Sequence, residues 1–371
     1  MIQIEHPIPF SPSYDLTKIG PLEQLLFFDI ETTGFSADTA SLYLIGCVYF
    51  REGQWHLCQW FADSRQAEAQ VLEAFFQRVQ EFSILVHFNG DTFDLPFLQK
   101  RSQRLHLPCS FGGAASVDIY RKIRPLKQLL GLSSLKQKAV EDFLGVCRKD
   151  TFSGGELIPM YGEYLKTGDE RLLHFLLLHN EDDLKGMPAI LPILSYVDWL
   201  EGPFSLTSYQ LEEGSAVPGQ IGPLLNLSYE SSVSLPASFS AQAEHVSCFA
   251  QGSLLKLQVE LYEGELKYFY SNYQDYYYLP WEDTAVHRSV GACVDPEARK
   301  KATAKTCYTR SQGVFLPQAA PLWSPALKRD YKDSLTFVPY EASLFEDRKN
   351  ASAYALLALE YLQNQKAKGK R

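Results

Sequence analysis

Leu25-Leu26-Phe27-Phe28-Asp29-Ile30-Glu31-Thr32-Thr33-Gly34 is the stretch that decides the fold of this chain. It begins with four consecutive large apolar residues, which is typical of a strand buried on both faces. Side chains alternate along a strand, so Asp29 and Glu31 project from the same face, near the end where ligand sites in α/β sheets lie. The stretch therefore predicts a central strand that carries two acids.

A pair of acids inside a sheet needs a compensating positive charge, because an unpaired buried carboxylate is costly. The chain offers no nearby cation in sequence, since it has no Lys or Arg between Lys18 and Arg51. We therefore expect a hard divalent metal ion at Asp29 and Glu31.

Composition places the chain among ordinary globular proteins. It has 371 residues, of which 46% are hydrophobic and 21% are charged, so it is long enough for two domains. Its formal charge of −9 argues against non-specific coating of nucleic acid, which needs a wide basic surface. It does not exclude an enzyme that holds phosphates through bound metals.

Cysteine usage and hydropathy predict a cytoplasmic protein. The seven cysteines are irregularly spaced and contain no C-x-x-C pair, which is typical of reduced thiols. The first residues lack the basic head and apolar core of a signal peptide. No uninterrupted run of about 18 apolar residues occurs, so we expect no membrane span.

The order of the patterns predicts two structured regions. We expect a lead-in segment over residues 1–24, a mixed α/β domain over 25–200, a connecting region over 201–245 and a strand-rich C-terminal region over 246–371. Within the α/β domain, apolar alternation and helical spacing predict strands at 42–50, 55–61, 84–88 and 116–119, and helices at 64–81, 134–144 and from Asp169 onward.

Two further acids occupy places that fit the same site. Asp94 comes just after the strand at 84–88, and Asp183 lies one helical turn after His179, so these two side chains share a helix face. Asp182 competes with Asp183, but its helical phase points about 100° away. We interpret Asp118, by contrast, as a capping or structural acid.

The ordered motifs resemble a known family. The set Phe27-Phe28-Asp29-Ile30-Glu31-Thr32-Thr33-Gly34, then Asn89-Gly90-Asp91-Thr92-Phe93-Asp94, then His179-Asn180-Glu181-Asp182-Asp183 looks like the DEDD superfamily of metal-dependent 3′-5′ exonucleases. These enzymes have a ribonuclease-H-like fold. Within the superfamily the chain most resembles the YprB-like branch, and the match covers about Leu25 to Leu194.

The resemblance implies a role for each matching residue. Asp29, Glu31, Asp94 and Asp183 would be the four metal-binding carboxylates, and His179 would be the general base. The chain departs from the family at one point. In one subclass three residues separate a Tyr from the last Asp, and in the other four residues separate a His from it. Here three residues separate His179 from Asp183, so His179 stands at the spacing that belongs to Tyr.

These residues suit phosphodiester hydrolysis. Oxygen ligands favour Mg²⁺ or Mn²⁺, and two such ions about 4 Å apart activate water and stabilise a leaving oxygen. We expect Thr32, Thr33 and Asn89 to hold the terminal nucleotide of single-stranded DNA or RNA. The basic residues expected to contact phosphates are Lys136, Lys138 and Arg148.

One alternative belongs to a different functional class. A non-catalytic nucleic-acid-binding module would keep the ribonuclease-H-like fold without turnover. Such a module has no evident reason to keep four clustered acids, and it would bind nucleic acid without divalent ions. The response to added metal therefore separates the two hypotheses.

Overall fold

The structure is a computed structural model that describes residues 1–10, 12–108, 110–146, 154–213 and 222–365. The chain divides into two compact units. The first comprises Met1–Lys127 and Leu132–Val197, and the second comprises Gln128–Gly131 and Asp198–Arg371. Arg148, one of the residues expected to contact phosphate, lies outside the described residues.

A six-stranded mixed sheet forms the centre of the first unit, with strand order β1-β4-β3-β2-β5-β6. Its strands are β1 Ile2–Ile8, β2 Leu25–Thr32, β3 Leu42–Arg51, β4 Gln54–Phe61, β5 Ile84–His87 and β6 Ala115–Asp118. The strands β2, β3 and β4 form the antiparallel meander that the sequence predicts. On the other side of β2, the strands β5 and β6 run parallel to it.

The N-terminal segment differs from its expectation as an extended lead-in. Residues Ile2–Ile8 form β1, which pairs antiparallel with β4 at the edge of the sheet. Their alternation of half-buried and exposed side chains suits an edge strand. The Pro and Ser content that suggested a lead-in begins only at Pro7, one residue before this strand ends at Ile8.

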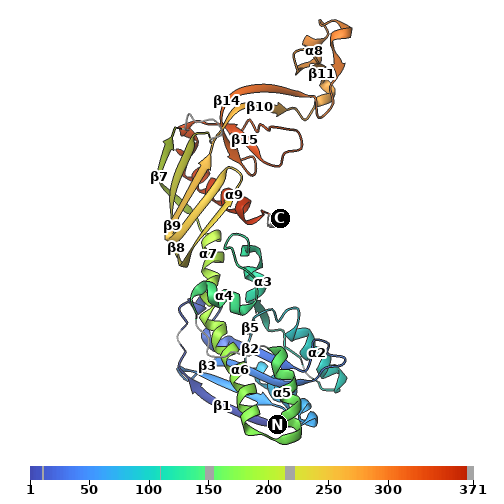
Figure 1. Cartoon of the computed structure of the whole chain (residues 1–371), viewed down its shortest axis with the longest axis vertical. Coiled ribbons are helices and arrows are strands. Elements are labelled where there is room, and N and C mark those ends of the chain that lie inside the picture. Colours follow the sequence, from blue (N-terminus) through green and yellow to red (C-terminus); the bar gives the residue numbers. More distant parts are fainter. Residues whose placement is uncertain (11, 109, 147–153, 214–221, 366–371) are drawn as a thin grey trace. The chain divides into compact units, whose positions relative to one another are not determined.

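Helices cover both faces of this sheet (Figure 1). The helices of the first unit are α1 Glu68–Val79, α2 Asp94–Arg104, α3 Ile119–Ile123, α4 Gln137–Leu144, α5 Gly154–Thr167 and α6 Glu170–Ala189. Helix α1 packs on β3 and β4, whereas α6 lies across β2 and β3. Asp169 caps α6, as predicted, by accepting a hydrogen bond from the backbone N–H of Arg171.

The pleat of β2 sorts its side chains between the two faces. Leu26, Phe28 and Ile30 join the apolar core that α1 also lines. The alternate positions include Asp29 and Glu31, which face α6. The two acids therefore share one face of the strand.

The second unit is strand-rich, as predicted, and its described residues form three separate three-stranded sheets. Its strands are β7 Phe204–Glu212, β8 Leu224–Ala243, β9 Val246–Glu260, β10 Tyr262–Phe269, β11 Tyr276–Leu279, β12 Thr284–His287, β13 Lys300–Lys301, β14 Tyr308–Gln318 and β15 Thr336–Pro339. Its helices are α8 Arg288–Gly291 and α9 Arg348–Gln363, and α7 Ser195–Glu201 leads into it.

The expected connecting region is largely strand. Strands β7 and β8 occupy most of residues 201–245 and pair with each other, and α9 covers the sheet they form with β9. Strand β8 buries alternate apolar side chains, including Leu225, Leu227 and Tyr229, which accounts for the low charge of its part of the region. Among the described residues, no helix is long and apolar enough to cross a membrane.

Candidate metal centre

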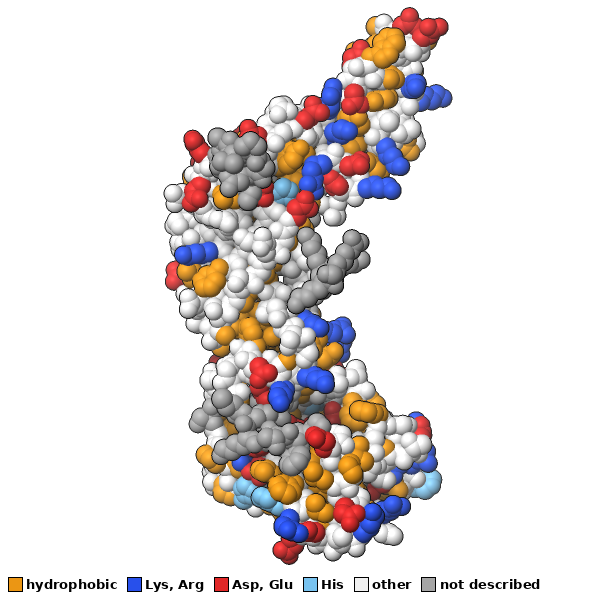
Figure 2. Space-filling model, in the orientation of Figure 1, with side chains coloured by type: hydrophobic (Ala, Val, Ile, Leu, Met, Phe, Trp, Pro, Cys, Tyr) orange, Lys and Arg blue, Asp and Glu red, His pale blue; other side chains and the backbone are white. Residues whose placement is uncertain are grey.

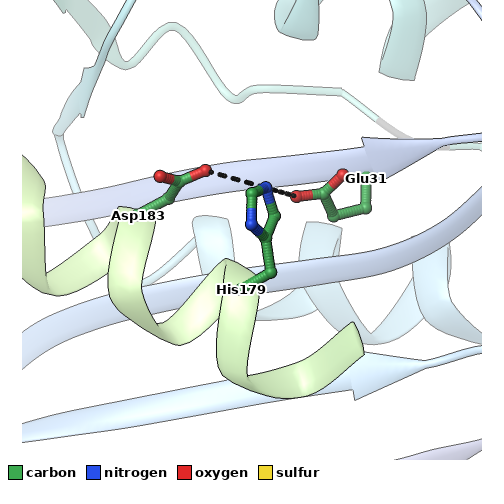
Figure 3. Close-up of side chains that lie close together, drawn as sticks. All are labelled: Glu31, His179 and Asp183. Carbon is green, nitrogen blue, oxygen red and sulfur yellow. Dashed lines mark ion pairs between the residues drawn. The ribbon is translucent and has the colours of Figure 1, made fainter. Parts of the chain in front are cut away.

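Side chains from β2 and α6 converge at one end of the central sheet. Asp29 and Glu31 come from β2, whereas His179 and Asp183 lie one turn apart on α6. Figure 3 shows Glu31, His179 and Asp183 pointing toward one another. The Nε2 atom of His179 lies 3.6 Å from Glu31 Oε1 and 3.4 Å from Asp183 Oδ2.

Asp94 joins this group from the first turn of α2. Its side chain is buried, and its charge contributes to raising the pKa of both Asp29 and Glu31. The structure thus brings together the four acids that the sequence singled out. They come from three elements that are far apart along the chain.

Burial and the charges of neighbouring acids both oppose ionisation of Asp29 and Glu31. Burial and the charge of Asp183 hold the pKa of Asp29 well above its usual range. Burial raises the pKa of Glu31 to about 8, although His179 partly opposes the rise. Burial likewise raises the pKa of Asp94 to about 7. A site of this kind holds more negative charge than its protein surroundings compensate.

The donor set fits hard divalent cations. The ligating atoms of Glu31, His179 and Asp183 lie within 4.8 Å of one another. Among the described residues, no Lys or Arg forms an ion pair with Asp29, Glu31 or Asp94. Carboxylate oxygens with one imidazole suit Mg²⁺ or Mn²⁺, and their charge explains why a cation belongs there.

These raised pKa values predict how the stability of the metal-free protein depends on pH. An acid whose pKa is higher in the folded state destabilises folding as pH rises from its unfolded to its folded pKa. For Glu31 this window runs from its ordinary pKa of 4.5 to about 8. In EDTA, the melting temperature of the wild type minus that of Glu31→Gln should therefore decrease as the pH rises from 5 to 8. A constant difference across this range would contradict the shift.

Asn180 is a site residue that the sequence reasoning missed. Its side chain is fully buried, and its Nδ2 donates a hydrogen bond to Asp29 Oδ2 at 3.0 Å. Its Oδ1 accepts a hydrogen bond from Gln59 Nε2 at 2.9 Å. Gln59, which is also buried, in turn donates to the backbone oxygen of Leu177. The chain of hydrogen bonds fixes the orientation of the Asp29 carboxylate.

Gly46 makes room for this amide. It stands directly opposite Asp29 on β3, and a Cβ atom there would lie 2.0 Å from Asn180 Oδ1. The glycine is therefore needed because the side chain of α6 approaches the sheet closely. The glycine within the apolar stretch 42–50 is visible in the sequence, but the sequence does not show that Asn180 packs against it.

Truncating Asn180 should destabilise the protein. Asn180→Ala leaves the buried amide of Gln59 short of one acceptor and removes the donor to Asp29, which should lower the free energy of unfolding by about 2 kcal/mol. Urea unfolding measures this change. The control is Glu181→Ala on the same helix, whose ion pair with Lys185 is solvent-exposed and should contribute below about 0.5 kcal/mol. Equal losses in the two variants would contradict the role of Asn180.

A second polar cluster holds the turn that precedes Asp94. Asp118 accepts hydrogen bonds from the backbone N–H groups of Asn89 and Asp91, and it caps α3 through Arg121. His87 Nδ1 accepts from the N–H of Gly90 at 3.0 Å, and burial lowers the pKa of His87. Asp118 is thus the capping acid that the sequence indicated. The neutral imidazole of His87 supports the same turn.

The three residues predicted to contact a nucleotide have different surroundings. Thr32 Oγ1 donates to the oxygen of Gly34, and Thr33 Oγ1 accepts from the N–H of Ser41, so both hydroxyls shape the loop after β2. Asn89 has a φ of 67° and lines a pocket beside the acids. Contact of these three residues with a substrate stays a prediction.

An aromatic side chain near the acids was also missed. Phe35 is 93% exposed in the loop that follows β2, and its ring lies edge to face with that of Phe93, with centroids 6.2 Å apart. Phe93 immediately precedes Asp94. A large apolar side chain left in solvent beside a polar site is more informative than one scattered elsewhere on a surface.

Comparison with known proteins agrees with this architecture. A family model described as RNase_H superfamily matches residues 26–194. The first unit has a ribonuclease-H-like fold. Its mixed six-stranded sheet with helices on both faces is the fold class predicted from the sequence, and the separate C-terminal sheets lie outside the matched residues.

Relatives that match part of the chain include DNA polymerases of two Thermococcus species. The chain is 31% identical to a DNA polymerase of Thermococcus aggregans over 29% of its own length, and 32% identical to one of Thermococcus litoralis over 27%. In each case it spans only 7% of the length of the relative. A solved family B DNA polymerase from Pyrobaculum calidifontis has a TM-score of 0.40 and 19% identity, over 48% of this chain and 26% of that one.

Proposed function

We propose that the ribonuclease-H-like domain is a metal-dependent nuclease of the DEDD type. It would hydrolyse phosphodiester bonds of single-stranded DNA or RNA from a 3′ end and release nucleoside 5′-monophosphates. The observation that carries the proposal is that Asp29, Glu31, Asp94 and Asp183 come together at one place. Among the described residues, no Lys or Arg forms an ion pair with the first three of these acids. Asp29, Glu31, Asp94 and Asp183 would hold two Mg²⁺ or Mn²⁺ ions.

Each side chain then has a separate task. Bound metal ions would supply an activated water and stabilise the leaving oxygen. Asn180 keeps the Asp29 carboxylate in one orientation through its 3.0 Å hydrogen bond. His179, whose Nε2 faces two of the acids, would take the proton of the attacking water as the general base.

The surroundings favour a single strand. The exposed ring of Phe35 suits stacking on an unpaired base, which contributes about 1–3 kcal/mol per base in single-strand-binding proteins. The net charge of −9 argues against a broad electrostatic grip on a duplex. Binding would therefore depend on a few local contacts and on the metals.

Incubating the full chain with 3′- and 5′-labelled single-stranded DNA and RNA tests the proposal. With Mg²⁺ or Mn²⁺, the 5′-labelled strand should shorten gradually, whereas the 3′ label should be released at once as a mononucleotide. EDTA should stop both reactions. No degradation of either substrate with either metal would overturn the proposal.

The alternative, a binding module without turnover, makes a different prediction for the same protein. It would bind single strands in EDTA as well as in Mn²⁺ and would show no rise in melting temperature on adding metal. The buried acids favour the nuclease, because a site with raised pKa values for Asp29 and Glu31 reduces stability unless a cation is bound there.

A further inference from the structure

A pocket of about 440 Å³ lies beside the candidate metal centre. Its lining comes from the end of β5, from α3 and from the start of α4, and consists of Phe88, Asn89, Tyr120, Leu135, Lys136 and Gln137. This is the size of an ordinary small-molecule site, and the lining combines aromatic rings with a few polar groups. The four acids themselves do not line it.

Direct contacts connect this pocket to the acids. Gln137 Nε2 donates to the backbone oxygen of Asp183 at 3.2 Å, so one wall of the pocket rests on the metal centre. On the other wall, the turn that begins at Asn89 leads directly into α2 and Asp94, held there by Asp118. A strand whose scissile phosphate lay at the acids would reach the pocket with its adjoining nucleotide.

The lining offers what a nucleotide needs. Phe88 and Tyr120 lie edge to face, with ring centroids 6.1 Å apart, and both are only partly buried, so ring surface is open to the pocket. Among the described residues, Asn89 Nδ2 and Gln137 Oε1 have no hydrogen-bond partner, which leaves one donor and one acceptor for a base edge. Lys136 is exposed at the rim.

Charge around the pocket differs sharply from the rest of the chain. Between Asp118 and Glu141 the sequence contains six Lys or Arg residues and no Asp or Glu, in a protein whose net charge is −9. Figure 2 shows blue side chains gathered over α3 and beside α4. Arg121 is paired with Asp91, but its side chain is 77% exposed. This is the local basic surface that a phosphate backbone requires.

We propose that this pocket binds the nucleotide next to the scissile phosphate, with its base against Tyr120 and Phe88 and its phosphate at Lys136. The inference rests on the proposed nuclease function and gives that function a second subsite. A strand would then be held at two points, the metal centre and the pocket. Cleavage of an oligonucleotide would need both, whereas cleavage of a single-nucleotide ester would need only the acids.

The test compares two substrates in the full chain with Mn²⁺. One is a labelled single-stranded oligonucleotide, and the other is the p-nitrophenyl ester of thymidine 5′-monophosphate, which has no second nucleotide. Tyr120→Ala and Lys136→Ala should each raise KM for the oligonucleotide by roughly 10-fold, the effect of one lost stacking or phosphate contact. Hydrolysis of the ester should stay unchanged.

Matched variants separate the pocket from general charge or folding effects. Tyr120→Phe keeps the ring and should behave like the wild type, and Lys166→Ala removes one exposed charge on α5, outside the pocket. Lys136→Ala alters an exposed side chain, so it remains informative if Tyr120→Ala fails to fold. If the wild type cleaves both substrates and Lys136→Ala matches it on both, the pocket proposal is overturned. If the wild type cleaves neither, the nuclease function fails and the pocket proposal falls with it.

Discussion

Replacing Asp29 with Asn is expected to abolish nuclease activity while stabilising the metal-free protein. The amide keeps an oxygen that can accept the hydrogen bond from Asn180, but it removes a buried charge that Asp183 and Glu31 repel. Activity should fall by at least about 1,000-fold, as for other groups that stabilise charge in a transition state. The free energy of unfolding in EDTA at pH 8 should rise by about 1–3 kcal/mol.

The opposite signs make this variant informative. Activity on the labelled oligonucleotide and urea unfolding in EDTA measure the two effects separately. Asp38→Asn is the matched control, because Asp38 is an exposed acid in the loop after β2. It forms ion pairs with Lys100 and Arg104. It should change neither quantity by much. Full activity of Asp29→Asn would remove Asp29 from the site, and a loss of stability would show that its charge is compensated in the folded protein.

Replacing His179 with Gln is expected to lower kcat by about 100-fold or more, the usual contribution of a general base. The structure places His179 Nε2 between Glu31 and Asp183, at distances that also suit a shared metal ligand. A base and a ligand differ in one measurable respect. Loss of a base leaves metal binding intact, so the rise in melting temperature on adding Mn²⁺ should persist in His179→Gln.

His174→Gln provides the control for this experiment. His174 lies on the same helix but is exposed, so its replacement should leave kcat and the metal response unchanged. If His179→Gln loses the metal-induced rise together with its activity, His179 acts as a ligand. If it keeps full activity, His179 serves only to neutralise the acids, and another group takes the proton.

The sequence was informative where a residue's type and its spacing agreed. The apolar run from Leu25 to Phe28 followed by two acids at alternate positions predicted a buried strand with a two-carboxylate face, and β2 has that form. The helical spacing of His179 and Asp183 predicted a shared face. On that face the imidazole of His179 lies close to both Glu31 and Asp183. Both inferences rest on local periodicity, which the backbone geometry enforces.

Local patterns failed where pairing partners lie far away in the chain. Ile2–Ile8 became a strand because β4 offered an edge, and residues 204–212 and 224–243 became strands because they pair with each other and with β9. Nothing within these segments specifies such a partner. Asn180 was missed for the same reason, since its importance depends on Asp29 and Gln59, which are 151 and 121 residues away.

The stretch from Leu25 to Gly34 by itself determined a buried strand whose two acids share a face, because side-chain alternation is a property of any strand. The residue types along the chain also determined which acids were candidates for the site. Only the tertiary structure decided how these acids are oriented. Helix α6 crosses β2 and β3 so closely that Gly46 must lack a side chain. Asn180 occupies the space beside Gly46 and orients the Asp29 carboxylate through a hydrogen bond. Packing between distant elements, which no local pattern encodes, also formed the pocket beside Asp183.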